Sequence, residues 1–200
     1  MTVSVREYMW TPWDQPGNEH LRLRMDDGDG GDGSIQADSQ IVMIADDADD
    51  RVLRVSYRIE LDASWRVRST RIASEQPDGS VIGLVLQADG RGNWTDGGGM
   101  PLHELDGCID VDIQATPFTN TLPIRRLALK PHQQETFRVA YVRVPSLDVS
   151  AEEQCYTGLA DGRVRYESVE TGFTRDLDVD RDGSVVTYHG LFRRVWPRRS

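Results

Sequence analysis

The feature that most constrains this chain is a two-residue alternation of apolar and polar side chains, repeated in many short segments. In residues 51–62, RVLRVSYRIELD, the apolar positions include Val52, Tyr57 and Ile59. A period of two places successive side chains on opposite faces of a β-strand, whereas a helix needs a period near 3.6. Further segments of this kind, each rich in Val, Ile, Tyr and Arg, are residues 64–74, 80–90, 136–149, 162–169 and 184–192.

These segments recur at short intervals with turn residues between them, which is typical of a large antiparallel sheet that curls or closes. DASW (62–65), PDGS (77–80) and ADGRG (88–92) have the composition of hairpin connections. A helical pattern is limited to one short turn near residues 145–154. The sequence therefore predicts an all-β, mainly antiparallel fold with little helix.

Charge narrows the classes of function. The chain of 200 residues has 33 acidic and 23 basic residues, for a formal net charge of -10. This balance disfavours nucleic-acid binding, which depends on basic patches. The sequence shows no apolar run long enough to span a bilayer and no secretory signal pattern at its first residues, so we expect a cytoplasmic protein. Lys130 is the only lysine, and the acids are mainly Asp, which favours a halophilic origin.

Two acidic, low-complexity stretches interrupt the alternation, at residues 26–34 and 46–50. Both lack apolar side chains that could pack, so they are expected to be solvated loops on either side of one short strand, residues 39–45. Neither marks a domain boundary. We therefore predict one domain over residues 1–200, with acidic insertions at 26–38 and 46–50.

Metal and disulfide chemistry have little support. Cys108 and Cys155 have no Cys or His at zinc-ligand spacing. We expect two buried thiols, with a disulfide between them as the less favoured alternative. Residues 178–189 match the first positions of a calcium-binding EF-hand loop, but His189 stands where the closing Glu should be. We favour an Asp-rich hairpin turn there, and we predict no metal and no cofactor.

Candidate catalytic groups are also few. The chain has no G-x-S-x-G elbow, and its four histidines are scattered. Asp110 and Asp112 fall on one face of a strand, where they could act as an acid and a base. We prefer the alternative, in which they bond to nearby arginines.

The densest polar segment is GCIDVDIQATPFTNTLPIRRLAL, residues 107–129. Its middle, TPFTNTLP, favours an irregular loop because of Pro117 and the small hydroxyl residues. Arg125 and Arg126, if they lay on a strand, would point to opposite faces, and an inward Arg would need a carboxylate such as Asp110 or Asp112. Polar groups among apolar walls fit either a cavity for an amphipathic small molecule or a buried structural network.

This segment closely resembles the signature of the bacterial and archaeal family named Putative glycolipid-binding. The resemblance runs from about Trp10 to Arg194 and breaks at the two acidic insertions. Further motifs that carry it are Gly17-x-Glu19-His20, Tyr57-x-Ile59, Trp65-x-x-Arg68, Asp89-Gly90-x-Gly92-x-Trp94, Gln154-x-Tyr156, Arg165-Tyr166-Glu167-Ser168, Asp180-x-Asp182-Gly183 and Gly190-x-Phe192-Arg193-Arg194.

The resemblance implies a single spiral β-roll, similar in shape to periplasmic carriers of lipoproteins, without an established catalytic residue. Our first hypothesis is a non-catalytic binding protein for a glycolipid or another amphipathic ligand, with an acyl tail in the roll and a polar head at its mouth. The candidate apolar wall is Trp65, Trp94, Phe118 and Tyr141. The candidate polar end is Arg68, Asp110, Asp112, Thr119, Asn120 and Arg125.

Two alternatives belong to other classes. One is an enzyme acting on a sugar or lipid substrate through Asp110 and Asp112, which requires a raised pKa in a solvent-reachable cleft. The other is a structural or interaction protein whose roll is filled by its own side chains.

Overall fold

The computed structural model describes residues 2–28, 33–44, 51–76 and 78–197. Fourteen strands form one sheet. They are β1 (Val3–Pro12), β2 (Gly17–Asp26), β3 (Ser34–Ile44), β4 (Val52–Asp62), β5 (Val67–Glu75), β6 (Val81–Ala88), β7 (Trp94–Asp96), β8 (Asp110–Ile113), β9 (Gln134–Val142), β10 (Val149–Gly158), β11 (Val164–Ser168), β12 (Thr174–Val179), β13 (Val185–Tyr188) and β14 (Phe192–Trp196).

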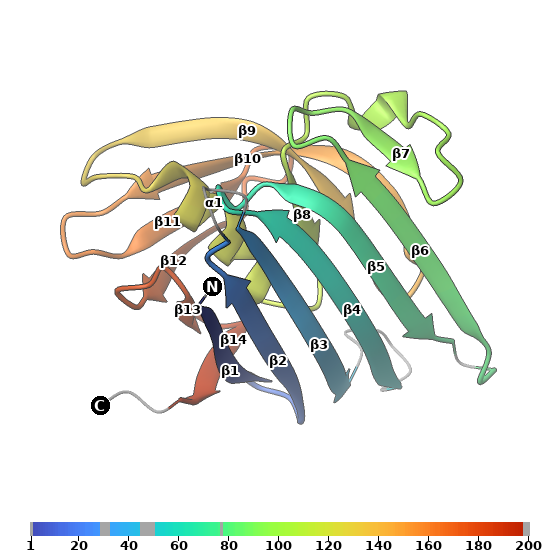
Figure 1. The fold of residues 1–200 in the computed structure, drawn as a ribbon. Coiled ribbons are helices and arrows are strands. Elements are labelled where there is room, and N and C mark those ends of the chain that lie inside the picture. Colours follow the sequence, from blue (N-terminus) through green and yellow to red (C-terminus); the bar gives the residue numbers. More distant parts are fainter. Residues whose placement is uncertain (1, 29–32, 45–50, 77, 198–200) are drawn as a thin grey trace.

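The sheet consists of two meanders joined in its middle. One runs from β7 back to β1 and the other from β14 back to β9, and β1 pairs with β14 between them. All neighbouring strands are antiparallel except β8 and β9, which are parallel. Figure 1 shows the sheet curling round the α-helix α1 (Thr121–Leu127), so that the two halves of the sheet face each other. The all-β, mainly antiparallel prediction is confirmed.

The alternation in the sequence corresponds to the two faces of the sheet. In β2, Leu21 and Leu23 are buried while Arg22 and Arg24 are exposed, and β3 and β4 follow the same rhythm. The register places Leu21 beside Tyr8 of β1 and Ser39 of β3, so buried residues of neighbouring strands share one face. Burial of this face supplies most of the driving force for the curl.

Aspartates begin four of the turns. The Oδ1 atoms of Asp62, Asp89, Asp96 and Asp180 each accept two backbone N–H groups, two and four residues further along the chain. An Asp side chain that bonds to the following backbone stabilises a turn in this way. The hairpins predicted at residues 62–65, 77–80 and 88–92 are confirmed, with Pro77 itself outside the described residues. Part of the Asp excess is therefore structural.

Residues 115–123 are buried without a break and lie inside the curl. The expected irregular loop is a 3-10 helix, η2 (Phe118–Asn120), that continues into α1. Pro123 is tolerated because it lies in the first turn, where a backbone N–H has no partner within the helix. We call residues 114–127 the plug. Arg125 and Arg126 stand on this helix and not on a strand, which corrects the sequence-based prediction.

Two other local expectations change, and one is confirmed. The strand expected at residues 39–45 is β3, which begins at Ser34, so residues 34–38, expected to belong to the acidic insertion, are part of the sheet. Residues 29–32 and 45–50 lie outside the described part. The helical turn expected near residues 145–154 is a turn followed by β10 from Val149. Residues 178–189 form β12, a tight turn and β13, as the hairpin alternative predicted.

The interior contains two packed clusters. The larger one joins the inner face of β1–β5 to the plug and to one face of β8 and β9, around Trp10, Tyr57, Trp94, Phe118 and Leu122. The other 3-10 helix, η1 (His103–Leu105), contributes the buried Leu105 to this cluster. The second cluster lies on β10–β13 and includes Tyr156, Tyr166 and Tyr188. In the described part of the chain, no helix is long and apolar enough to cross a membrane.

Candidate functional site

The two candidate carboxylates of β8 bond to groups of the protein. Arg126 of α1 donates to Asp110 from Nε at 3.2 Å and from Nη2 at 2.5 Å, and the Asp110 carboxylate is 1% exposed. Asp112 accepts hydrogen bonds from Thr119 at 2.7 Å and Gln154 at 2.6 Å. Burial raises the pKa of both aspartates, and the hydrogen bonds oppose that rise.

This arrangement makes the pair a clamp on the plug. Asp110 has the bidentate arginine that the sequence led us to prefer, whereas Asp112 bonds to neutral groups. Neither residue lines the groove described below. The geometry favours a structural network over an acid–base pair facing a substrate.

A third buried carboxylate, Glu19 of β2, holds the other side of the plug. Its oxygens accept hydrogen bonds from Ser39 at 2.8 Å, Tyr57 at 2.6 Å and Thr116 at 2.6 Å. Burial raises the pKa of Glu19 to about 7. In the sequence, Glu19 stood out only as part of a motif. It could have been recognised as a buried charge because it is in phase with the inward-facing residues of β2.

A groove of about 590 Å³ opens where the plug meets three hairpin turns. The turns are those between β4 and β5, between β10 and β11, and between β12 and β13. Its apolar lining comes from Trp65, Ile124, Leu129, Tyr156, Leu159, Val164 and Val179. Its charged lining comes from Arg125, Arg163, Asp180, Arg181 and Asp182. A volume of this size is within the usual range for small-molecule sites.

Arg125 is held firmly in this groove. Its guanidinium carbon lies 4.5 Å from the centroid of the Trp65 ring, and Nη1 donates a hydrogen bond to the carbonyl of Asp182. Gly183 leaves room for it, because a Cβ there would lie 2.9 Å from the Arg125 Cδ. Trp65 itself has a left-handed backbone with φ of 64°, which is uncommon for a bulky residue.

The structure therefore brings two of the predicted ligand residues together, Trp65 and Arg125. The other eight lie elsewhere. Arg68 is exposed on β5 and donates to the carbonyl of Asp89. Trp94 is buried and donates from its indole to the Cys108 carbonyl at 2.7 Å.

The remaining predicted residues have structural contacts. Phe118 stacks on Tyr57 with ring centroids 6.5 Å apart. Asn120 accepts a hydrogen bond of 2.8 Å from the Tyr156 hydroxyl. Tyr141, on β9, packs under Arg143 at 5.2 Å. Thr119, Asp110 and Asp112 belong to the clamp on the plug.

Leu159, Arg163 and Arg181 also line the groove, and the sequence alone did not identify them. A signal was present in the two Asp-Gly turns, because alternate hairpins of an antiparallel meander lie at the same end of the sheet. The turns that contain Gly162 and Gly183 are alternate hairpins of this kind. The two turns can be recognised as alternate hairpins only when every strand between them is known, and the alternation pattern did not identify every strand.

Metal and thiol chemistry find no geometric support here. Asp180 accepts two backbone N–H groups and a 2.6 Å bond from Arg194. In the described residues, no group of three or more His, Cys, Asp or Glu side chains is arranged to hold a metal ion. Cys108 and Cys155 are buried free thiols, so the disulfide left open by the sequence is absent from the structure.

Comparison with known proteins identifies the family. No curated protein matches the sequence significantly. A protein of the DUF1089 family from Pseudomonas aeruginosa, whose crystal structure is known, matches with 38% identity and a TM-score of 0.78, over 92% of this chain and 95% of that chain. The family described as "Putative glycolipid-binding" matches residues 7–194. The resemblance seen in the sequence is confirmed, and this chain belongs to the Putative glycolipid-binding family.

Proposed function

We propose that this protein binds an amphipathic ligand without chemical conversion, and that it does so in the groove between the plug and the three turns. One observation carries the proposal. The groove places an apolar wall, including Ile124, Leu129 and Leu159, beside a charged rim that contains Arg125 and Arg181. A cavity with both kinds of surface is suited to a ligand with an apolar tail and a polar head. The family description agrees with such a ligand.

The groove, and not the centre of the roll, is the place for the tail. The centre is occupied by the side chains of the larger cluster, among them Trp94, Phe118 and Leu122. Each CH₂ group that a tail buries contributes about 0.8 kcal/mol. A tail of six to eight carbons on the apolar wall therefore supplies roughly 5–6 kcal/mol, enough for measurable binding without a closed tunnel.

The filled centre of the roll also favours a second candidate, a structural or interaction protein without a small-molecule ligand. Under that proposal the groove is only a junction between turns. The two candidates differ in whether a lipid-like molecule is retained by the purified protein.

Native mass spectrometry of gently purified protein tests this difference. We expect a discrete adduct of several hundred daltons that organic extraction releases and that fragments as a lipid or glycolipid. Leu159→Glu, which places a charge on the apolar wall, should abolish the adduct. Val81→Glu makes the same kind of change at a residue that is 65% exposed on β6, away from the groove, and should retain it. A bare polypeptide mass, together with no binding of added alkyl glycosides, would overturn the proposal in favour of the second candidate.

A further inference from the structure

We infer that the ligand's polar head is anionic, and that Arg125 and Arg181 are the residues that bind it. This inference rests on the proposed function, because it concerns the same groove. It adds the sign of the head's charge, which neither the family description nor the apolar wall determines.

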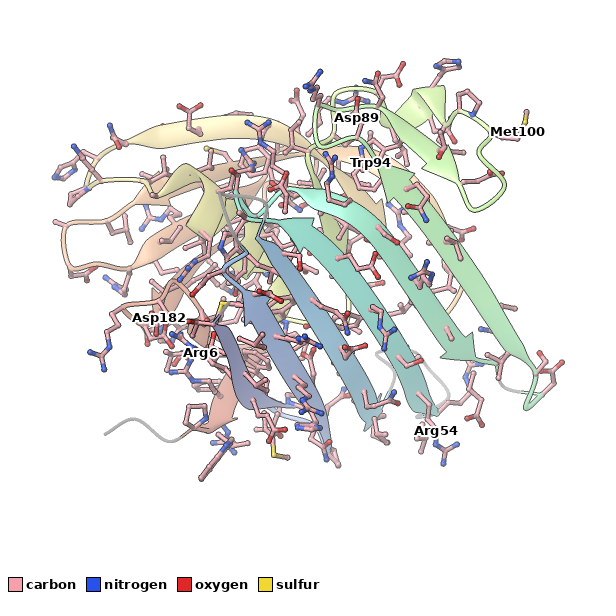
Figure 2. The ribbon with its side chains drawn as sticks, viewed as in Figure 1. Arg6, Arg54, Asp89, Trp94, Met100 and Asp182 are labelled. Atoms are coloured by element: carbon pink, nitrogen blue, oxygen red, sulfur yellow. The ribbon has the colours of Figure 1, made fainter. Side chains whose placement is uncertain are left out.

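The first step is the charge balance of the groove's acidic residues. Asp182 forms a 2.6 Å ion pair with Arg6 of β1, and Figure 2 shows these two labelled residues side by side. Asp180 forms a 2.6 Å ion pair with Arg194 of β14. Neither Arg6 nor Arg194 lines the groove. Each acidic side chain of the rim is therefore already neutralised by an arginine that lies outside the groove.

The second step concerns the three arginines of the rim. Arg163 is balanced, since it pairs with Asp161 at 2.7 Å and with Asp176 at 3.2 Å. Arg125 and Arg181 differ from it. Among the described residues, no carboxylate lies within ion-pair distance of either guanidinium. The groove thus has two unbalanced positive charges in a protein whose formal net charge is -10.

The third step is the fixed position of Arg125. The Trp65 ring lies beneath its guanidinium, Gly183 packs against its stem, and the Asp182 carbonyl accepts one of its N–H groups. A guanidinium has five N–H donors, so several remain for a ligand. A side chain already fixed in its binding geometry loses little entropy when a ligand arrives. The planar guanidinium is suited to bidentate hydrogen bonding with a carboxylate or a phosphate.

A neutral sugar would leave both guanidinium charges unbalanced after binding had removed water from around them. Loss of that water is costly unless a counter-charge replaces it. An anionic head supplies the counter-charge, and repulsion from the acidic remainder of the surface is screened by salt. We therefore expect selection for an acidic amphiphile, whether a sugar acid or a phosphate.

A matched pair of detergents tests the inference below their micellar concentrations. Octyl β-D-glucuronide and octyl β-D-glucoside share a tail and a ring and differ in one carboxylate. We expect the glucuronide to bind at least tenfold more tightly by calorimetry, with a preference that shrinks as salt is raised. Octyl phosphate distinguishes the source of the charge, since tighter binding of it than of the glucuronide indicates a phosphate head.

Two variants locate the effect. Arg125→Gln should reduce the preference for the glucuronide, because only Arg181 then remains to balance the carboxylate. Arg54→Gln, which removes an exposed pair between Arg54 of β4 and Glu75 of β5, should leave the preference intact. Arg54 lies far from Asp182 in Figure 2.

Equal binding of both glycosides would overturn the anionic head while leaving the groove as a binding site. Failure of every probe to bind would overturn the proposed function and this inference together. A preference that is undiminished in Arg125→Gln would overturn the assignment to this residue.

Discussion

The hydroxyl of Tyr57 donates a 2.6 Å hydrogen bond to the carboxylate of Glu19, and both side chains are buried between the sheet and the plug. Ser39 and Thr116 complete the set of donors round the same carboxylate. Thr116 belongs to the plug, so this cluster fastens the plug to β2, β3 and β4. Its energetics depend on whether Glu19 carries a proton.

The first prediction concerns pH. Burial raises the pKa of Glu19 from 4.5 to about 7, so the folded protein binds a proton that the unfolded chain releases between these values. The contribution of this group to stability is therefore full below pH 4.5 and is lost as the pH rises to about 7, by about 3 kcal/mol in total. Urea denaturation at pH 5 and pH 8 should show the loss.

Glu19→Gln isolates this effect from the other buried carboxylates, Asp110 and Asp112, whose raised pKa values act in the same direction. The variant should lose about 2–3 kcal/mol less than the wild type between the two pH values. Parallel pH curves for the two proteins would show that Glu19 titrates normally.

The second prediction concerns the clamp on the plug. Arg126→Met leaves the Asp110 carboxylate buried without its partner, so we expect a loss of about 3–5 kcal/mol in the free energy of unfolding. Arg54→Met breaks an exposed pair with Glu75 and should cost no more than about 1 kcal/mol. Restoring neutrality with Asp110→Asn in the Arg126→Met background should recover part of the loss. Equal effects of the two Met variants would mean that the buried pair contributes no more than a surface one.

The third prediction separates the groove's shape from its stability. Gly183 and Gly99 both have positive φ, at 75° and 86°, so an alanine at either position should cost about 1–2 kcal/mol. The Cβ of Gly183→Ala would also meet Arg125, whereas Gly99 lies outside the groove and the Cβ of Gly99→Ala has no atom within 4 Å. Melting temperatures of the two variants should fall together, while only Gly183→Ala should weaken the binding of octyl β-D-glucuronide. Unchanged binding in Gly183→Ala would show that Arg125 tolerates displacement.

The fourth prediction follows from the acidic surface. A net charge of -10 with Asp as the main acid implies self-repulsion that dilute buffer does not screen. Circular dichroism should show a melting temperature that rises steadily from dilute buffer to molar potassium chloride. An identical fold and melting temperature in both would remove the halophilic interpretation.

The sequence predicted the fold class because period-two burial is a local property that each strand displays by itself. Residues 51–62, for example, became β4 almost unchanged. β1 and β12 were missed because their alternation is weak, whereas β2 alternates clearly and was overlooked. The first residues of β3, Ser34 to Asp38, were assigned to the neighbouring acidic stretch. α1 was missed because seven residues with a proline give no helical periodicity, and the packing of the plug decides their conformation.

The groove was harder to foresee than the fold. Trp65 and Arg125 were both named from the sequence, but their contact depends on how far the sheet curls. Arg163 and Arg181 became relevant only when alternate turns met the end of the plug. Such a site has no local signature because its parts come from distant hairpins.

The pairing of β1 with β14 has a consequence for the order of assembly. Each meander is built from neighbours in the sequence, so each can form soon after its own strands are synthesised. The seam between the meanders joins strands from opposite ends of the described chain, and it also brings Arg6 to Asp182 and Arg194 to Asp180 at the rim of the groove. The rim of the groove is therefore completed last, so a chain interrupted before β14 has the turns of the groove but lacks part of its charge balance.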